Sequence, residues 1–213
     1  AQGLPSSSDS PRCFLSACPP LPAMTSIACK AAAMAMAVSA SIASATVCPS
    51  SPALIHAWSE VEATVGKATC KTVIDEMLAR VNGQDSKAWH DPHNNGVYTL
   101  LSQTQNQLDF SRETGDGKYT DKLTFTFQDG GCGPAGCTCQ VSGCSQSQVF
   151  SIADFSTNYC NLRMLYCGGR DGCHPVTKDG VAVSVEETKI SSSLGASHDA
   201  AACLKTAAKD IVV

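Results

Sequence analysis

The chain has 213 residues, a length typical of one domain, and its 15 Lys plus Arg against 19 Asp plus Glu give a formal net charge of -4. No block of five or more basic residues occurs, which argues against a nucleic-acid partner because such binding depends on a basic patch. Thirteen cysteines far exceed cytosolic usage and indicate an oxidising compartment, where thiols persist as disulfides.

The N-terminal segment predicts export. Residues 1–23 are rich in Pro and Ser without apolar periodicity, so we expect a disordered leader, and the first methionine at Met24 indicates that it is not natural coding sequence. Residues 24–45 have the features of a signal peptide: Lys30, then about a dozen apolar residues, then the cleavage site Ala43-Ser44-Ala45. An Ala-rich buried helix is the alternative. The apolar stretch is too short to cross a bilayer core of about 30 Å, so no membrane span is expected in the mature chain.

The segment that remains after cleavage, residues 46–213, is expected to be a single disulfide-rich domain in the secretory lumen or outside the cell. Removing three of the thirteen cysteines leaves ten, which can close five bridges, whereas an odd count leaves a free thiol. We therefore predict disulfides among all ten: Cys48, Cys70, Cys132, Cys137, Cys139, Cys144, Cys160, Cys167, Cys173 and Cys203.

The first predicted element of this domain is a helix. Apolar residues recur at three- and four-residue steps over 70–81, with Cys70 among them, so the helix should be tied to a sheet. Upstream, residues 54–65 continue a helical pattern up to Gly66, and Asn82-Gly83 is a helix stop because Gly tolerates the left-handed conformation. The side expected to face water carries Asp75, Glu76 and Arg80.

From Asn95-Gly96 onward, apolar residues recur at every second position instead of every third or fourth. The patterns predict strands over 97–103, 107–112 and 120–128, a further strand over 149–155, and a last one through Val181, Val183 and Val185, whereas 130–144 is a loop and 191–213 a loop with a small helix. Such alternation implies a sheet with one buried face and one solvent-exposed face. We expect an α+β fold: one N-terminal helix packed on a four- to five-stranded antiparallel sheet, disulfide-stapled.

The sharpest cluster of chemically active residues is His90, Asp91 and His93. Two imidazoles and a carboxylate at this spacing could ligate zinc or copper, or supply a general base with its orienting acid. The competing interpretation is a surface loop, because Asp-Pro and Asn-Gly are ordinary turn sequences.

The cysteine-rich stretch from Cys132 to Cys144 has spacings that zinc sites also use, but in a secreted chain disulfides are favoured over metal. Cys137 and Cys139 are too close to bridge each other, so each should reach a distant partner. No Gly-x-Ser-x-Gly motif supports a nucleophilic serine. We therefore predict no resident metal or cofactor.

The stretch 147–168 is rich in aromatic residues. We expect it to be the main packing strip of the core; the alternative is a face that binds a partner, in which Tyr159, Arg163 and Tyr166 would make the contacts.

Two resemblances bear on origin and layout. The run SQVFSIADFSTNYCNLRMLYCGGRDGC at 147–173 resembles a family of small secreted cysteine-rich proteins of microalgae, which implies no activity. A helix ending at 79–83, then 98–101 and 119–127 with a string of cysteines, is similar to the cystatin and cathelicidin layout. Cystatins inhibit papain-like proteases with a Gln-x-Val-x-Gly hairpin, and the nearest stretch here, Gln103 to Gln107, lacks the Val and the Gly.

The sequence therefore favours a secreted, non-enzymatic protein that binds an extracellular protein or a small ligand, since loops on a rigid frame commonly carry recognition. A hydrolase or metalloenzyme using His90, Asp91 and His93 is one alternative. A cystatin-like protease inhibitor is the other.

Overall fold

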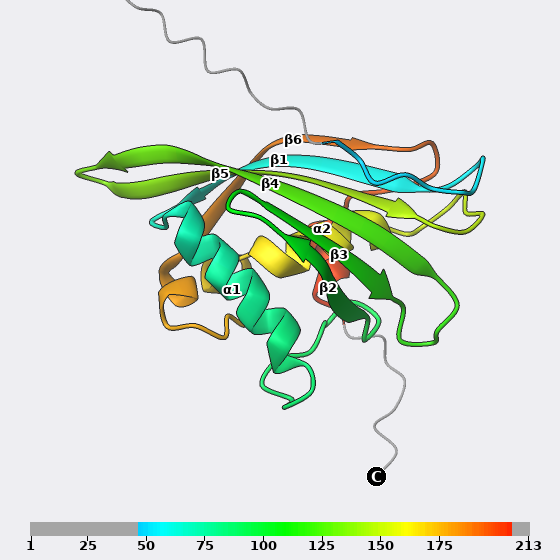
Figure 1. Ribbon diagram of the computed structural model, residues 1–213, viewed down its shortest axis with the longest axis horizontal. Coiled ribbons are helices and arrows are strands. Elements are labelled where there is room, and N and C mark those ends of the chain that lie inside the picture. The colour runs from blue at the N-terminus through cyan, green and yellow to red at the C-terminus, as the bar shows by residue number, and fades with distance from the viewer. Residues whose placement is uncertain (1–46, 206–213) are drawn as a thin grey trace, which may run out of the picture. The chain divides into compact units, whose positions relative to one another are not determined.

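The computed structural model describes residues 47–205, and the predicted leader and signal peptide lie outside this range (Figure 1). The described chain contains the strands β1 (Trp58–Gly66), β2 (Val97–Gln103), β3 (Gln107–Glu113), β4 (Thr120–Gly133), β5 (Gly136–Ser147) and β6 (Ser184–Ser192). The helices are α1 (Cys70–Gly83), α2 (Thr157–Tyr166) and α3 (Ala200–Cys203), with short 3-10 turns η1 (Gly169–Asp171) and η2 (Asp179–Ala182).

The six strands form one antiparallel sheet in the order β2-β3-β4-β5-β1-β6. The α+β class is confirmed, but the predicted single N-terminal helix and four to five strands are wrong: the described chain has three α-helices, the first of which follows β1, and six strands. Residues 58–66 form a strand between β5 and β6, where the prediction placed a helix. The spacing of Trp58, Val61 and Val65 fits a helix, but Val61, Ala63 and Val65 also alternate, and pairing on both edges favours the strand.

Three predicted loop and strand assignments are also wrong. The last strand, expected through Val181, Val183 and Val185, begins only at Ser184, after the 3-10 turn η2. The stretch 130–144, expected to be a loop, is the end of β4 and most of β5, because a disulfide closes the hairpin where apolar packing is sparse. The stretch 149–155, expected to be a strand, is the connection between β5 and α2 and pairs with no strand of the described sheet.

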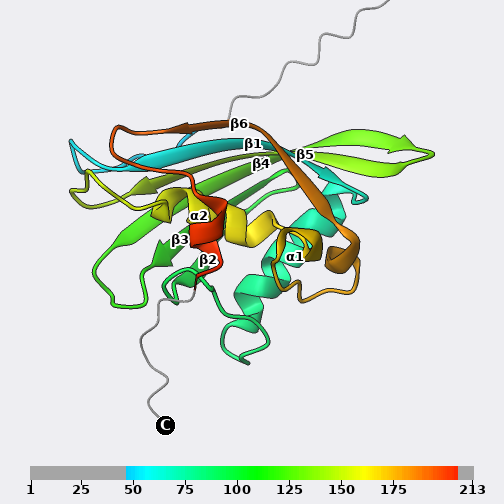
Figure 2. The same ribbon diagram turned by 180° about the vertical axis from the view of Figure 1, so that it is seen from behind.

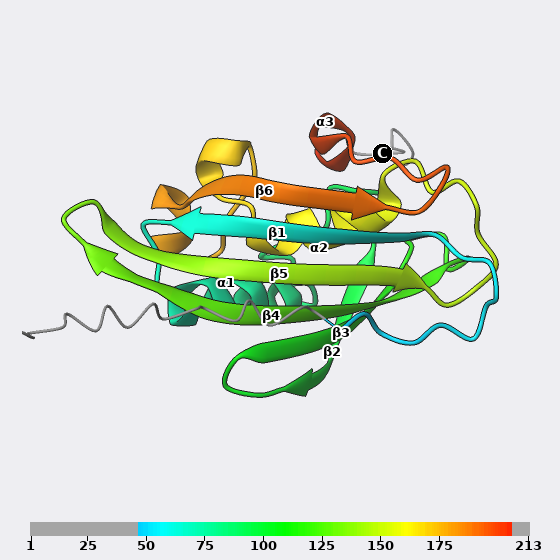
Figure 3. The ribbon, with the colours of Figure 1, turned by 90° about the horizontal axis from the view of Figure 1, so that it is seen from above.

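Both long helices pack on one face of the sheet (Figure 2), and no helix of the described chain lies on the other face (Figure 3). The buried residues of α1 include the predicted apolar face, but Glu76 and Arg80 are buried as well, contrary to the sequence prediction. Glu76 Oε1 accepts from Arg80 Nε at 2.7 Å, and Arg80 donates to the backbone oxygens of Met164 and Cys167, each at 2.7 Å. A second helix, which the sequence pattern did not predict, thus covers this side of α1 and has its terminal carbonyls satisfied there.

Five disulfides use all ten predicted cysteines: Cys48–Cys144, Cys70–Cys139, Cys132–Cys137, Cys160–Cys203 and Cys167–Cys173. The predicted tie between the helix and the sheet is confirmed by Cys70–Cys139, and Cys203 does hold the C-terminal helix. The expected distant partner for Cys137 is wrong, because it bridges to Cys132 across the hairpin, five residues away. Within residues 47–205, no helix is long and apolar enough to cross a membrane.

Candidate functional site

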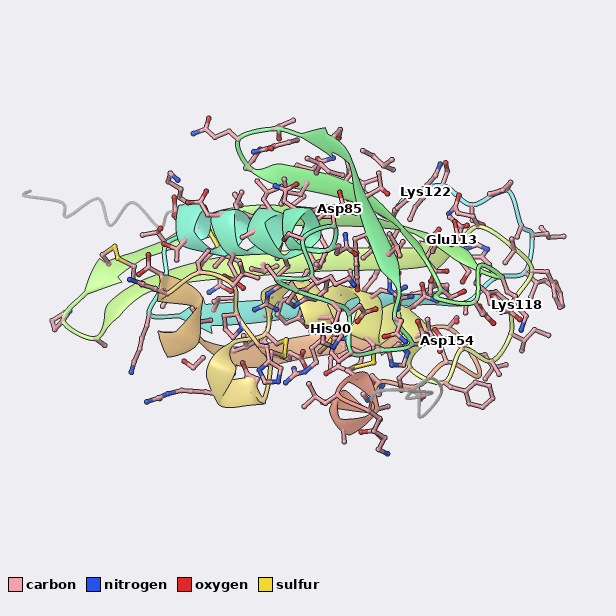
Figure 4. All side chains as sticks on the ribbon, turned by 90° about the horizontal axis from the view of Figure 1, so that it is seen from below. Asp85, His90, Glu113, Lys118, Lys122 and Asp154 are labelled. Atoms are coloured by element: carbon pink, nitrogen blue, oxygen red, sulfur yellow. A yellow bond between two sulfur atoms is a disulfide. The ribbon has the colours of Figure 1, made fainter. Side chains whose placement is uncertain are left out.

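The predicted cluster of two histidines and an aspartate lies on the loop between α1 and β2, and the structure separates its members. His90 is exposed (Figure 4), whereas Asp91 is buried. His93 is half-buried, with Nδ1 3.2 Å from the Ala202 carbonyl oxygen and Nε2 3.4 Å from Thr157 Oγ1. Burial lowers the pKa of the His93 imidazole. The three side chains therefore have different surroundings.

Asp91 is paired with Arg112 of β3. Arg112 Nε lies 3.1 Å from Asp91 Oδ2, Nη2 donates to the same oxygen, and both side chains are fully buried. Asp91 Oδ1 accepts from the His93 amide at 3.0 Å, which is the turn contact expected of this sequence. Burial raises the pKa of Asp91, and the guanidinium opposes that rise. Both carboxylate oxygens are thus engaged within the fold.

Arg112 also fixes the next residues of the loop. Its Nη2 donates to the His93 carbonyl at 2.6 Å and to Asn94 Oδ1 at 2.7 Å. Asn94 and Asn95 both have a φ of 53°, in the left-handed region that non-glycine residues rarely adopt. Gly96 follows, where a Cβ would lie 2.2 Å from the guanidinium. Arg112 therefore imposes the shape of this loop.

The three residues predicted to bind a partner come together around one carboxylate. Tyr159, Arg163 and Tyr166 share a face of α2, and Glu187 of β6 accepts from Tyr159 at 2.7 Å and from Arg163 and Tyr166 at 2.6 Å each. Burial and this carboxylate raise the pKa of both tyrosines. The register shift between β1 and β6 occurs beside Glu187. Tyr159 and Tyr166 are buried and Arg163 is partly buried, and together they hold the edge strand on α2, as expected of a core strip.

A cavity of about 510 Å³, which we call the loop-end pocket, opens at the end of the sheet opposite the β4–β5 hairpin. Figure 4 shows two of its lining residues, Lys118 and Asp154, at this end and apart from His90. The pocket is enclosed by the loop before β2, the β3–β4 turn and the connection from β5 to α2. Its lining residues are Asn94, Asn95, Thr114, Gly115, Asp116, Lys118, Tyr119, Asp121, Ser147, Ser151, Ala153, Asp154, Phe155 and Thr157.

The floor of the pocket belongs to a polar row that crosses the sheet. Register pairing places Tyr98, Arg112, Asp121 and Ser147 side by side on β2, β3, β4 and β5, on the face that the helices cover. Asp121 Oδ1 accepts from Ser147 Oγ at 2.5 Å and Oδ2 from Asn161 Nδ2 at 2.7 Å. Burial raises the pKa of Asp121 above its ordinary value. The pocket therefore has a buried carboxyl group at its base.

Asp154 forms the wall next to α2 and caps that helix. Its Oδ1 accepts from the Ser156 amide at 3.2 Å, and its Oδ2 accepts from the Asn158 amide at 3.0 Å and from Asn158 Nδ2 at 2.9 Å. A carboxylate at this position satisfies free N–H groups of the first turn and favours the helix dipole.

The rim of the pocket is strained and aromatic. Phe155 and Ser156 have φ values of 49° and 73°, so four of the six non-glycine residues with positive φ in the described chain lie beside this pocket. Such backbone strain often accompanies functional sites. Tyr119 and Phe155, exposed by 45% and 81%, supply two aromatic rings at the rim.

Other loops at this end of the sheet carry further exposed apolar side chains. The segment before β1 contributes Leu54 and Ile55, and the connection after β5 contributes Phe150 and Ile152. The Ser151 amide donates to the Ile55 carbonyl at 3.3 Å, so the two segments are adjacent. Exposed apolar groupings of this kind are typical of interaction surfaces.

Strand alternation is the sequence signal for Asp121 of the pocket floor and for its neighbour Arg112. Arg112 falls in phase with Leu108 and Phe110, and Asp121 with Leu123 and Phe125, so each charged residue continues an apolar face. A charge on the buried face of a strand needs a partner, and that signal points to this end of the sheet.

Within residues 47–205, the one grouping of three potential metal-ligating atoms comprises Cys48, Cys144 and Glu60, and the two sulfurs are joined in a disulfide. Comparison with protein families, with characterised proteins and with solved structures finds no match to this chain. The stretch Gln103–Gln107, where a cystatin would carry its inhibitory hairpin, forms the β2–β3 turn, with the Thr104 amide 2.9 Å from the Gln107 carbonyl oxygen.

Proposed function

We propose that the protein is a secreted, non-enzymatic binding protein that holds a small organic cation in the loop-end pocket. The observation that carries this proposal is the cavity of about 510 Å³ with the Asp121 carboxyl group at its floor. Cavities of 300 to about 1,000 Å³ with a few convergent polar groups are typical ligand sites. Secretion is supported by the five disulfides, which persist in oxidising compartments.

The charges of the lining favour a cation. Asp116 and Lys118 pair with each other at 2.9 Å, which leaves Asp121 and Asp154 as the remaining carboxyl groups of the lining. Each Asp121 oxygen accepts one bond from the protein, and a carboxylate oxygen can accept a second. An ammonium group in the pocket can therefore donate to a carboxylate already held in place.

The aromatic rim favours the same ligand class. Tyr119 and Phe155 line the pocket and remain substantially exposed, so their rings are available to an incoming molecule. Aromatic faces attract organic cations, and a ring also covers the apolar part of a ligand. A small amine with an apolar body could pair its ammonium group with Asp121 at the floor and pack its apolar part against the two aromatic rings of the rim.

A binding role is favoured over catalysis because the described lining contains no histidine or cysteine that could serve as base or nucleophile. The alternative enzyme built on His90, Asp91 and His93 gains no support from a cluster whose members are separated and whose carboxylate is paired with Arg112. The inhibitor alternative likewise gains none from a tight β2–β3 turn.

Three probes of equal size and different charge test the proposal: benzylammonium, benzyl alcohol and benzoate. Titration of the oxidised protein at pH 7, followed by NMR, should show benzylammonium binding with amide shifts at the β3–β4 turn and around Asp154. Phe155→Ser should weaken that binding about fivefold. Phe150→Ser, which changes an exposed Phe of the same connection outside the pocket lining, should leave it unchanged. Equal binding of all three probes, or none by benzylammonium, would refute a cation site.

A further inference from the structure

A second cavity, of about 370 Å³, lies between the loop that follows α1, the C-terminal half of α2 and the disulfide loop closed by Cys167–Cys173. We call it the basic cavity. It shares no lining residue with the loop-end pocket. Its lining residues are Arg80, Lys87, Ala88, Trp89, His90, Pro92, Met164, Gly172, Cys173, His174 and Leu204.

Every ionisable side chain that lines the basic cavity is basic: Arg80, Lys87, His90 and His174. Lys87, His90 and His174 are exposed, so their nitrogens are accessible to a ligand. The described lining includes no carboxylate. The loop-end pocket, by contrast, has three aspartates in its lining. The two cavities therefore favour ligands of opposite charge.

The carboxylates that interact with Arg80 do not offset the other basic groups. Glu76 Oε1 accepts from Arg80 Nε at 2.7 Å, and its other oxygen accepts from the Thr177 amide at 2.8 Å. Asp171 Oδ2 accepts from the Gly168 amide at 2.8 Å. Arg80 is thus neutralised by Glu76, and the positive charge available to a ligand comes from Lys87, with the two exposed imidazoles as further N–H donors.

The remaining walls of the basic cavity are apolar. Trp89, Pro92, Met164 and Leu204 line it, and Trp89 is only 5% exposed, with its ring 5.9 Å from that of Tyr98. A buried and packed indole gives a ligand a fixed surface. A purely inorganic anion would leave these walls uncovered, so the lining suits an anion with an apolar body.

The loop that carries Lys87 has a defined shape. Lys87 has a φ of 60°, in the left-handed region, and its amide donates to the Gln84 carbonyl at 3.1 Å. The Trp89 amide donates to the Gly83 carbonyl at 3.2 Å. These bonds hold Lys87, Trp89 and His90 together at the C-terminal end of α1.

We propose that the basic cavity binds a small organic carboxylate, whose charge is met by Lys87, His90 and His174 and whose apolar body lies against Trp89. This site is separate from the one in the proposed function and goes beyond it. The carboxylate would be small, since the cavity is smaller than the loop-end pocket.

The same three probes test this site with the opposite expectation. Titrations use the intact oxidised protein at constant ionic strength and constant pH. Benzoate should shift the Trp89 indole and the His90 and His174 ring signals. It should bind about tenfold more tightly than benzyl alcohol, and benzylammonium should leave these signals in place.

Two exposed residues provide matched variants. Lys87→Gln should weaken benzoate binding about fivefold, whereas Lys122→Gln, which changes an exposed lysine of β4 outside the cavity lining, should leave it unchanged. If benzoate and benzyl alcohol bind equally, or if Lys87→Gln and Lys122→Gln weaken benzoate to the same extent, the basic residues do not form a site. Because the reporter signals belong to Trp89, His90 and His174, failure here is distinguishable from failure at the loop-end pocket.

Discussion

Arg112 and Asp121 face each other as register partners on β3 and β4, yet Arg112 donates to Asp91 while Asp121 accepts from Ser147 and Asn161. Two buried carboxylates thus flank one buried guanidinium, and Arg112 Nη1 has no hydrogen-bond partner among the described atoms. Such an arrangement stabilises the fold only while every charge keeps its partner. It lies directly beneath the loop-end pocket, so the pocket's shape depends on it.

Removal of Arg112 should therefore be strongly destabilising. Arg112→Leu leaves Asp91 buried without its charge partner, and the free energy of unfolding should fall by about 3 to 5 kcal/mol. The double variant Asp91→Leu and Arg112→Leu should recover part of that loss, because no buried charge is left unpaired. Denaturant titration measures both.

Lys71→Ala provides the control for this prediction, since it breaks the exposed Lys71–Asp75 pair on α1 and should change stability by less than about 0.5 kcal/mol. Equal losses for Lys71→Ala and Arg112→Leu would contradict a special role for the buried pair.

The raised pKa of Asp121 gives a pH-dependent prediction. An unfolded Asp titrates near pH 4, and the folded protein holds this proton more tightly, so its contribution to stability is present below about pH 4 and is lost as the pH rises through the folded pKa. Asp121→Asn removes this dependence. The stability of the variant relative to the natural protein should therefore increase with pH over that interval. A difference that stays flat from pH 4 to 7 would show that burial does not perturb Asp121.

The ten cysteines allow a prediction about unequal disulfides. Cys132–Cys137 closes a separation of 5 residues in the hairpin tip, while Cys48–Cys144 closes one of 96. Chain entropy then predicts a stability loss on the order of 2 kcal/mol for the paired Ser variant of the first bridge and about 5 kcal/mol for that of the second. Thermal unfolding of the two double variants compares them directly. A larger loss from the hairpin bridge would mean that native packing, not chain entropy, dominates.

The sequence predicts those elements whose pattern is contained in a few neighbouring residues, and it does not predict contacts between distant segments. The strands 97–103, 107–112 and 120–128 were predicted because alternation is a local pattern, and the helix from Cys70 for the same reason. Helix α2 was missed because its residues are buried on almost all sides, so no polar face marks the period. His90 and Asp91 are adjacent in sequence, yet His90 is exposed and Asp91 is buried. Asp91 is buried because it pairs with Arg112 of β3, and no local sequence pattern encodes that contact.

The three hydrogen bonds that Glu187 of β6 accepts from α2 support a final prediction about the edge of the sheet. Glu187→Ala removes the acceptor of Arg163, Tyr159 and Tyr166 together and leaves a largely buried guanidinium unpaired, so stability should fall by about 3 kcal/mol. Hydrogen exchange should accelerate along β6, because α2 no longer holds that strand. Glu186→Ala, at the exposed neighbouring position, should leave both stability and exchange near those of the natural protein. If Glu187→Ala lowers stability without faster exchange in β6, the hydrogen bonds to Glu187 stabilise α2 alone and do not hold the edge strand.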